Sequence, residues 1–244
     1  MTDGAKDIVI REVVKDVWTF SRPFNLFGRL PVGGRSTAIR LKDGKVWVLA
    51  STPLTEDTKK KLAELGEVRW IIAPNAFHHL FVKPFKDAYP DAKVIGPEEV
   101  NVKRQAEGWQ LDAVTSTDSS SVKFGFEEEI DYCFFSGHSN KDTVYLHKTS
   151  KTVIAADILF NLPGTEQYTL AKSMPYVPFF NSWTPRSWIM KFFVWKKELN
   201  YETMKRDVQT VASWDFEKWI PCHGNVIESN AKAAFKTAYA RYRA

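Results

Sequence analysis

Residues 143–160 read TVYLHKTSKTVIAADILF, and this stretch decides the fold of the chain. Two runs rich in β-branched, aliphatic and aromatic residues flank a short polar turn, which is the pattern of a β-hairpin. The second run delivers one carboxylate, that of Asp157. Strand ends are where α/β folds usually hold their ligands. The stretch therefore predicts a hairpin that carries one residue of a metal site or an acid/base site.

Four of the five histidines follow other predicted strands in the same manner. They are His78, His79, His138 and His223. We expect the strand ends at Asn75, Ser136, Asp157 and Pro221 to converge on one edge of the fold, because each is followed by, or ends in, such a side chain. Imidazole and carboxylate groups are natural ligands for zinc, iron or manganese. The fifth histidine, His147, lies inside the hairpin and is expected to be a surface or sheet residue.

The length and composition indicate one α/β domain. A chain of 244 residues with 44% hydrophobic residues can bury a large core, so we expect a single domain over 1–244, with 1–7 disordered. No apolar run reaches the length of about 18 residues that a membrane span needs, and no signal-peptide pattern opens the chain. Two cysteines make no disulfide framework, and we expect a cytoplasmic protein.

The charge pattern restricts the partners. The net charge is +5, and the basic residues are spread along the chain instead of forming the stripe that nucleic-acid binding favours. We therefore expect a small-molecule substrate and no nucleic acid. Contact with a membrane surface is not expected, and a homodimer is left open.

Local signals predict the order of the elements. Thr55 is a predicted helix N-cap and Gly66 a helix end, and this helix lies between two apolar runs, which predicts a parallel strand pair. Further on, we expect paired strands around a turn at 127–129, and Pro185 in the first position of a helix. The remaining predicted helices span 187–197, 200–213 and 228–241.

From Gly33 to His223 the chain resembles proteins of the metallo-β-lactamase fold, and in particular a divergent subgroup with a Pro-Asn-x-x-His-His element, here at 74–79. The resemblance implies an αββα sandwich. The third-motif histidine matches His138, the bridging aspartate matches Asp157, and the final histidine matches His223. The first motif, His-x-His-x-Asp-His, is degenerate.

The degenerate motif has a consequence for metal binding, again through the resemblance. If His79 takes the last position of the first motif, His78 stands at its aspartate, and Pro74 and Ala76 stand at its two leading histidines. One metal of the family's pair then loses most of its ligands. The other keeps His78, His79, Asp157 and His223. We therefore expect one divalent ion, zinc or alternatively iron or manganese, or none.

Three assignments remain open between function and structure. His78 and His79 are adjacent, so their side chains diverge and one of them is expected to be structural; we favour His79 as the ligand. His138 is either a further ligand or, with Asp157 and His78, an acid/base group. Cys222 is more simply a buried small residue than a nucleophile, as is Cys133.

The segment 168–195 is rich in aromatic residues and, in its first part, in proline, and it follows the strand that carries Asp157. Core packing is the simplest interpretation. The second is a pocket wall or lid, with Phe180 and Trp183 contacting an apolar or aromatic substrate. The third is an interface, either of a dimer or with a membrane surface.

Together these features favour a metallo-β-lactamase-like hydrolase that uses at most one metal ion and acts on a small, partly apolar or aromatic substrate. The alternatives are a metal-free protein that binds a small molecule or catalyses proton transfer, as lyases and isomerases do, and a non-catalytic scaffold.

Overall fold

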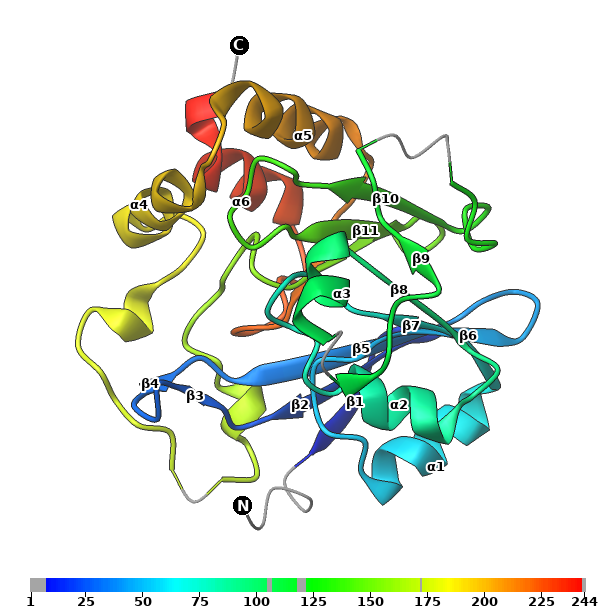
Figure 1. Ribbon diagram of the computed structural model, residues 1–244. Coiled ribbons are helices and arrows are strands. Elements are labelled where there is room, and N and C mark those ends of the chain that lie inside the picture. The colour runs from blue at the N-terminus through cyan, green and yellow to red at the C-terminus, as the bar shows by residue number, and fades with distance from the viewer. Residues whose placement is uncertain (1–7, 105–106, 118–121, 172, 243–244) are drawn as a thin grey trace.

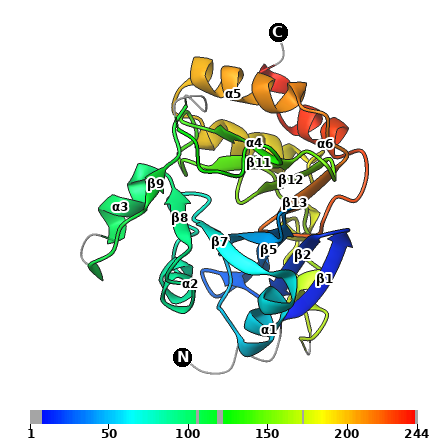
Figure 2. The same ribbon diagram turned by 90° about the vertical axis from the view of Figure 1, so that its right-hand side faces the viewer.

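The computed structural model describes residues 8–104, 107–117, 122–171 and 173–242. Two β-sheets pack face to face, and helices cover the outer face of each sheet (Figure 1). Figure 2 shows the resulting layers, with α1 and α2 below the larger sheet and α4, α5 and α6 above the smaller one. This is the αββα sandwich that the sequence predicts. The expected disorder of 1–7 lies outside the described residues.

The larger sheet has seven strands in the order β1-β2-β5-β6-β7-β8-β9. Its strands are β1 (Val9–Val14), β2 (Val17–Arg22), β5 (Gly34–Arg40), β6 (Lys45–Leu49), β7 (Glu67–Ile72), β8 (Lys93–Gly96) and β9 (Ala113–Val114). The pairs from β1 to β6 are antiparallel, and those from β6 to β9 are parallel. The predicted parallel pair is therefore confirmed as β6 and β7.

The smaller sheet has four strands in the order β10-β11-β12-β13. They are β10 (Ile130–Phe134), β11 (Thr143–His147), β12 (Thr152–Ala155) and β13 (Lys218–Pro221). The antiparallel pairing of β11 with β12 confirms the predicted hairpin, and β13 runs parallel to β12. The chain positions that follow β12 and β13, which carry Asp157 and His223, therefore emerge at the same edge of this sheet.

Six α-helices occur in the described part of the chain. They are α1 (Glu56–Leu65), α2 (Val82–Ala88), α3 (Glu98–Arg104), α4 (Trp188–Lys197), α5 (Tyr201–Ser213) and α6 (Ala231–Ala238). Thr55 caps α1 by accepting from the backbone N–H of Thr58, and Asn200 caps α5 in the same way. A short hairpin of β3 (Asn25–Leu26) and β4 (Leu30–Pro31) projects from the larger sheet.

Three apolar layers hold the sandwich together. Between the sheets, Trp47, Trp70 and Tyr145 are packed in a cluster with Ile154 and Ile220. A second layer lies between the larger sheet and α1 and α2, and a third between the smaller sheet and α4 to α6. Strands buried on both faces explain why their sequences read as continuous apolar runs.

Some local predictions are wrong for physical reasons. The run 124–126 forms no strand, because the carboxylate of Glu127 accepts the backbone N–H groups of Phe124 and Gly125 and turns the chain. The helix α4 begins at Trp188 with Ser187 as its N-cap, not at Pro185. The predicted helix 228–241 begins only at Ala231. No helix in the described ranges is long and apolar enough to cross a bilayer.

Candidate metal centre

Three side chains meet at the edge of the sandwich. His78 Nε2 lies 3.2 Å from Asp157 Oδ1 and 3.2 Å from His223 Nε2. His223 Nε2 lies 3.4 Å from the same carboxylate oxygen. The three atoms therefore form a nearly equilateral triangle. Ligand atoms around a tetrahedral zinc ion with bonds of about 2.0–2.1 Å stand roughly 3.3 Å apart, so the triangle has the size of one face of such a site.

The tautomer of His223 leaves its Nε2 atom free to bind a cation. Its Nδ1 lies 2.6 Å from the carbonyl oxygen of Gly33. A carbonyl can only accept, so Nδ1 must carry a hydrogen, which places the lone pair of a neutral ring at Nε2. The ring is also stacked on Phe160, with centroids 5.3 Å apart and planes 5° from parallel. A hydrogen bond behind and a ring beside it fix the direction of this donor atom.

His78 is held from its opposite side in the same way. Its Nδ1 forms a hydrogen bond with Ser51 Oγ, in the loop after β6, while Nε2 faces the triangle. Burial alone would lower the pKa of His78, but the adjacent Asp157 charge and hydrogen bond raise it well above its usual value. Burial opposes the charge of Asp157, yet His78 and His223 hold the pKa of that carboxyl well below its usual range. The carboxylate of Asp157 is therefore ionised and lies beside two imidazole nitrogens, a group that could hold a cation.

The second oxygen of Asp157 is held by two amides. Asn75 Nδ2 donates to Oδ2 at 2.8 Å, and Asn140 Nδ2 donates to it at 2.7 Å. Asn75 also donates to Asp142 Oδ2, which accepts the backbone N–H of Asp157 at 2.7 Å. Burial and the Asp157 charge raise the pKa of Asp142 to about 7. This network leaves Oδ1 as the atom of Asp157 that faces the two histidines.

From the sequence, His79 is favoured over His78 as the ligand, but the structure brings His78, and not His79, to the triangle. Asn75 Oδ1 accepts the backbone N–H groups of both Phe77 and His78, which curls the chain directly after β7. On this turn the adjacent histidines point apart. His79 Nδ1 accepts from Arg104 Nε at 2.6 Å, on the side of α3. Burial, followed by the nearby cations, lowers the pKa of His79 to about 4, so its ring is neutral.

His138 is fully buried and lies outside the triangle. Its Nδ1 accepts the backbone N–H of Asn140 at 3.2 Å, and its Nε2 has no hydrogen-bond partner among the described residues. Burial lowers its pKa to about 4. Close by, Lys197 Nζ donates to Asn140 Oδ1 at 3.0 Å. An ammonium group thus lies beside the region that the resemblance assigns to a first metal, where Ala76 offers no side-chain ligand.

Two buried residues that the sequence analysis missed hold His223 in place. Arg35 Nη1 donates to the carbonyls of Pro221 and Gly224 at 2.7 and 2.6 Å. Gln167 Nε2 donates to the Cys222 carbonyl at 2.8 Å, while its Oε1 accepts the Gly224 N–H at 2.9 Å. These contacts span 55 to 189 positions of the chain. No local pattern in the sequence marks either residue, because their partners lie so far away along the chain.

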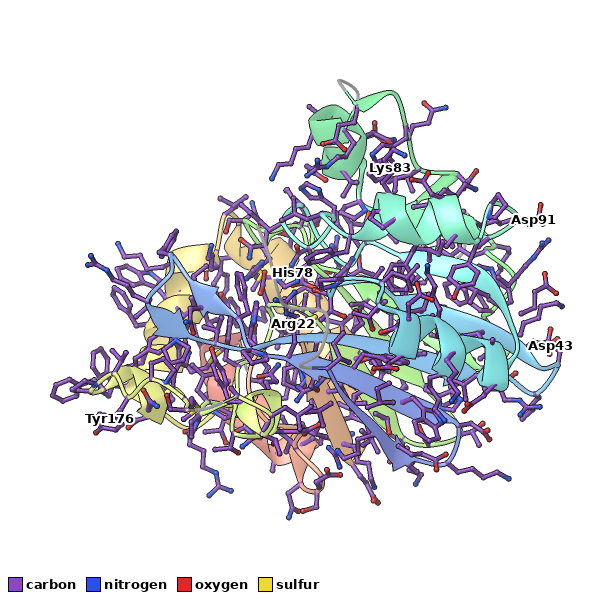
Figure 3. The ribbon with its side chains drawn as sticks, turned by 90° about the horizontal axis from the view of Figure 1, so that it is seen from below. Arg22, Asp43, His78, Lys83, Asp91 and Tyr176 are labelled. Carbon is purple, nitrogen blue, oxygen red and sulfur yellow. The ribbon has the colours of Figure 1, made fainter. Side chains whose placement is uncertain are left out.

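A cavity of about 620 Å³ lies over the triangle. Its wall is mainly apolar, and two cationic residues, Arg22 and Lys197, also line it. The apolar wall is formed by Phe24, Leu26, Phe27, Val32, Phe77, Leu80, Phe81, Phe160 and Phe193. Figure 3 shows His78 and Arg22 near the middle of the view from below. The site is therefore an apolar pocket with a polar floor and few charges.

The segment 168–195 contributes to this pocket differently from the prediction. Neither Phe180 nor Trp183 is among the described residues that line the cavity. Trp183 stacks on Phe160 with centroids 4.8 Å apart and meets Phe193 at 5.0 Å, so it supports the wall from behind. Phe180 packs edge-on against Trp183. The wall itself comes from Phe160, Phe193, the β3–β4 hairpin and the turn at 76–81.

The remaining candidates have structural surroundings. His147 is buried in β11 and bonds Ser150 Oγ at 2.8 Å, so it is a sheet residue and not a surface one. Cys133 lies in the apolar layer beneath the helices. Cys222 is buried in the layer between the sheets, next to His223 in the chain. Both thiols are free.

Comparison with known protein families shows the family to which the chain belongs. Residues 14–183 match the family described as domain of unknown function DUF4336. The chain belongs to the DUF4336 family. No curated protein sequence matches this DUF4336 member at a significant level.

Solved structures similar to this DUF4336 protein are metallo-β-lactamases. DIM-1 metallo-β-lactamase exposed to ceftazidime is 13% identical, with a TM-score of 0.64 and 98% of each chain covered. The enzyme from Hirschia baltica is 12% identical, with a TM-score of 0.63 and coverage of 98% and 99%. FIM-1 from Pseudomonas aeruginosa in its mono-zinc form is 10% identical, with a TM-score of 0.63 and 99% of each chain covered. The protein has the metallo-β-lactamase fold.

The donor set fits a divalent ion. Two imidazole nitrogens and one carboxylate oxygen lie within 4.8 Å of one another, and all three residues are buried or nearly so. Their other polar atoms are occupied by Ser51, Gly33 and the two amides on Asp157, which is the supporting arrangement that metal ligands need. Three protein ligands leave a coordination position open, as catalytic zinc sites do.

Proposed function

We propose that this protein is a hydrolase-like enzyme that uses one divalent ion and acts on a small, partly apolar or aromatic substrate. His78, Asp157 and His223 would hold the ion. The observation that carries the proposal is the triangle of donor atoms with sides of 3.2 to 3.4 Å at the floor of the cavity. An ion bound there would supply a water of lowered pKa and polarise a carbonyl group.

The chain's own residues would bind and orient the substrate. The apolar wall over the triangle favours a substrate with an alkyl or aryl portion, because burying apolar surface contributes roughly 25 cal/mol per Å². Lys197 lines the same cavity, and its ammonium group donates to the side-chain oxygen of Asn140, a neutral amide that does not neutralise its charge. It would bind an anionic group of the substrate or the negative charge that develops on a carbonyl oxygen.

His138 has no place in this scheme as a proton-transfer group. Its ring is fully buried and its Nδ1 is already occupied by the Asn140 N–H. In the alternative of a metal-free protein that catalyses proton transfer, a pair of residues other than His138 and Asp157 would therefore carry the proton. His78 and Asp157, 3.2 Å apart at the cavity floor, could exchange a proton with a bound molecule. The non-catalytic scaffold remains the outcome if neither activity is found.

Ester and lactone hydrolysis tests the proposal. Protein purified without a histidine tag is assayed on p-nitrophenyl esters and on lactones of increasing acyl length, before and after chelation and after return of zinc, iron or manganese. We expect turnover that disappears on chelation, returns with one of the metals and is lost in Asp157→Asn. His79→Ala is the matched control and should keep its activity. Turnover that survives chelation would contradict the metal-dependent proposal and favour the metal-free alternative.

A further inference from the structure

Large apolar side chains are exposed on three segments around the cavity. Phe27, at the tip of the β3–β4 hairpin, is 86% exposed, and Trp188 on α4 is 71% exposed. Tyr176 and Phe179, in the segment before α4, are each 78% exposed. Others on the same three segments are Phe24, Leu26, Phe77, Leu80, Leu170, Phe192 and Trp195. We call the segments 22–31, 76–81 and 168–197 together the rim face.

The three segments are neighbours in space. Tyr168 Oη donates to the carbonyl of Phe24 at 2.7 Å, which joins 168–197 to the β3–β4 hairpin. Lys197 Nζ lies 5.9 Å from the ring centre of Phe77, which joins α4 to the turn at 76–81. In Figure 1 the hairpin, the yellow segment and α4 follow one side of the molecule. Figure 3 shows Tyr176 at that end, opposite Asp43.

The rim face is free of acidic residues. The sequence holds no aspartate or glutamate between Asp16 and Asp43, or between Glu166 and Glu198. Glu166 and Glu198 themselves are turned to other partners, Arg35 and Arg241 among them. Among the described residues of the rim face the exposed cations are Arg29, Arg186, Lys191 and Lys196. The three segments of this face therefore carry exposed cations and no carboxylates of their own.

We propose that the rim face binds the surface of a membrane that contains anionic phospholipids. Exposed rings and leucines would enter the boundary between headgroups and acyl chains, and the cations would bind lipid phosphates. From the sequence alone we expected no such contact and ranked an interface last for 168–195. The structure now favours an interface for this segment. The observations that favour it are the acid-free surroundings and the exposure of large side chains, namely Phe27, Tyr176, Phe179 and Trp188.

Two other occupants fit the rim face less well. In a symmetric dimer this face would meet itself, and its cations would repel one another. A single-stranded nucleic acid would use the rings for stacking, but Leu26, Leu80 and Leu170 offer no ring to a base. The cavity that opens within the rim face is itself apolar, which suits an acyl chain. Lipid is the occupant that uses both the charges and the aliphatic side chains.

Flotation with lipid vesicles tests the proposal independently of any enzymatic activity. The whole protein is mixed with vesicles of phosphatidylcholine alone or with 30% phosphatidylglycerol, at low and at high salt, with and without chelator. We expect binding to the anionic vesicles, weakening as salt screens the charges, and no effect of chelator. Loss of the proposed metal chemistry would leave this result unchanged, so the two proposals fail separately.

Two double variants identify the surface. Lys191→Glu with Lys196→Glu should weaken vesicle binding by about thirtyfold or more, since each lysine near an anionic membrane contributes a factor of about five. Phe27→Ser with Trp188→Ser should weaken it by at least about tenfold. Lys42→Glu with Lys60→Glu is the matched control, because both lysines are exposed away from α4. Melting temperatures of all variants verify folding.

Three results would overturn the proposal. The first is equal binding to neutral and anionic vesicles, or none to either. The second is an equal loss of binding in the Lys42 and Lys60 control. The third is a dimer in sedimentation, or a complex with a 20-nucleotide single strand, that the Phe27 and Trp188 variant abolishes while vesicles show no binding.

Discussion

His78 and His223 approach each other through their Nε2 atoms, which lie 3.2 Å apart. His223 presents a lone pair there, because its Nδ1 hydrogen is donated to the Gly33 carbonyl. Two imidazole nitrogens at this distance fit either an Nε2–H of His78 that donates to His223 or a metal ion bound beside both atoms. The carboxylate of Asp157 would stabilise a positively charged His78 or a bound metal ion.

The adjacent histidines 78 and 79 give the sharpest pair of variants. His78→Ala should weaken zinc affinity by more than the roughly 10- to 100-fold that loss of a supporting residue costs. His79→Ala should change it little, because that ring is bonded to Arg104 instead. Titration of the metal-free protein with zinc, followed by calorimetry, measures both. An equal loss in the two variants would mean that His79 also reaches the ion.

Arg35 is expected to stabilise both the fold and the site. It is fully buried and bonds Ser21, Pro221 and Gly224. Arg35 also forms an ion pair with Glu166. Arg35→Met removes this ion pair and the buried hydrogen bonds, and should lower the free energy of unfolding by about 3–5 kcal/mol. Arg11 binds the same Glu166 from the surface, and Arg11→Met should cost no more than about 1 kcal/mol. Urea unfolding compares them, and equal losses would refute the role of Arg35.

Lys197 should affect substrate binding without affecting metal binding. Lys197→Met is expected to raise KM about tenfold for an ester that carries a carboxylate, and to change KM little for its neutral analogue. The neighbouring exposed Lys196 supplies the control variant, Lys196→Met. Zinc affinity should stay the same in both. A fall in kcat for neutral and anionic esters alike, with KM unchanged, would indicate that Lys197 acts on the transition state and not on the substrate's charge.

Asp207 predicts a specific dependence of stability on pH. Burial raises its pKa to about 6, although Arg206 acts in the opposite direction. The folded state therefore binds this proton more tightly than the unfolded state, whose carboxyl pKa is about 3.9. Stability contributed by the protonated form is present below about pH 4 and is lost as the pH rises toward 6.

Asp207→Asn tests this dependence. The variant has no carboxyl group at position 207, so it should not lose stability as the pH rises from about 4 to about 6. Its free energy of unfolding should therefore increase relative to that of the parent over this range. Urea unfolding across this range measures it. A difference that is constant with pH would show that Asp207 has an ordinary pKa in the folded protein.

The sequence predicts the sandwich well because its strands carry their signals locally. The hairpin of β11 and β12, the cap at Thr55 and the helix end at Gly66 all depend on neighbouring residues. The β3–β4 hairpin and the helices α2 and α3 were not predicted, since they are short and irregular in pattern. Phe124 and Phe126 lie next to a polar run and were predicted as a strand, but Glu127 turns the chain there while both rings stay buried.

The candidate site could be predicted only in part. The resemblance places Asp157 and His223 at strand ends, and the structure brings these two together. The choice between His78 and His79 depends on the turn that Asn75 imposes, which the sequence spacing does not reveal. The role of Arg35 depends on partners 186 and 189 positions away.

The number of metal ions per chain tests the central claim most directly. Native mass spectrometry of the untagged protein, after equilibration with a slight excess of zinc, iron or manganese, counts the ions that stay bound. We predict one ion per chain in the parent protein and none in Asp157→Asn. Two ions per chain, or an ion that Asp157→Asn retains, would contradict the assignment of His78, Asp157 and His223 as the metal centre, and so would the absence of any bound ion.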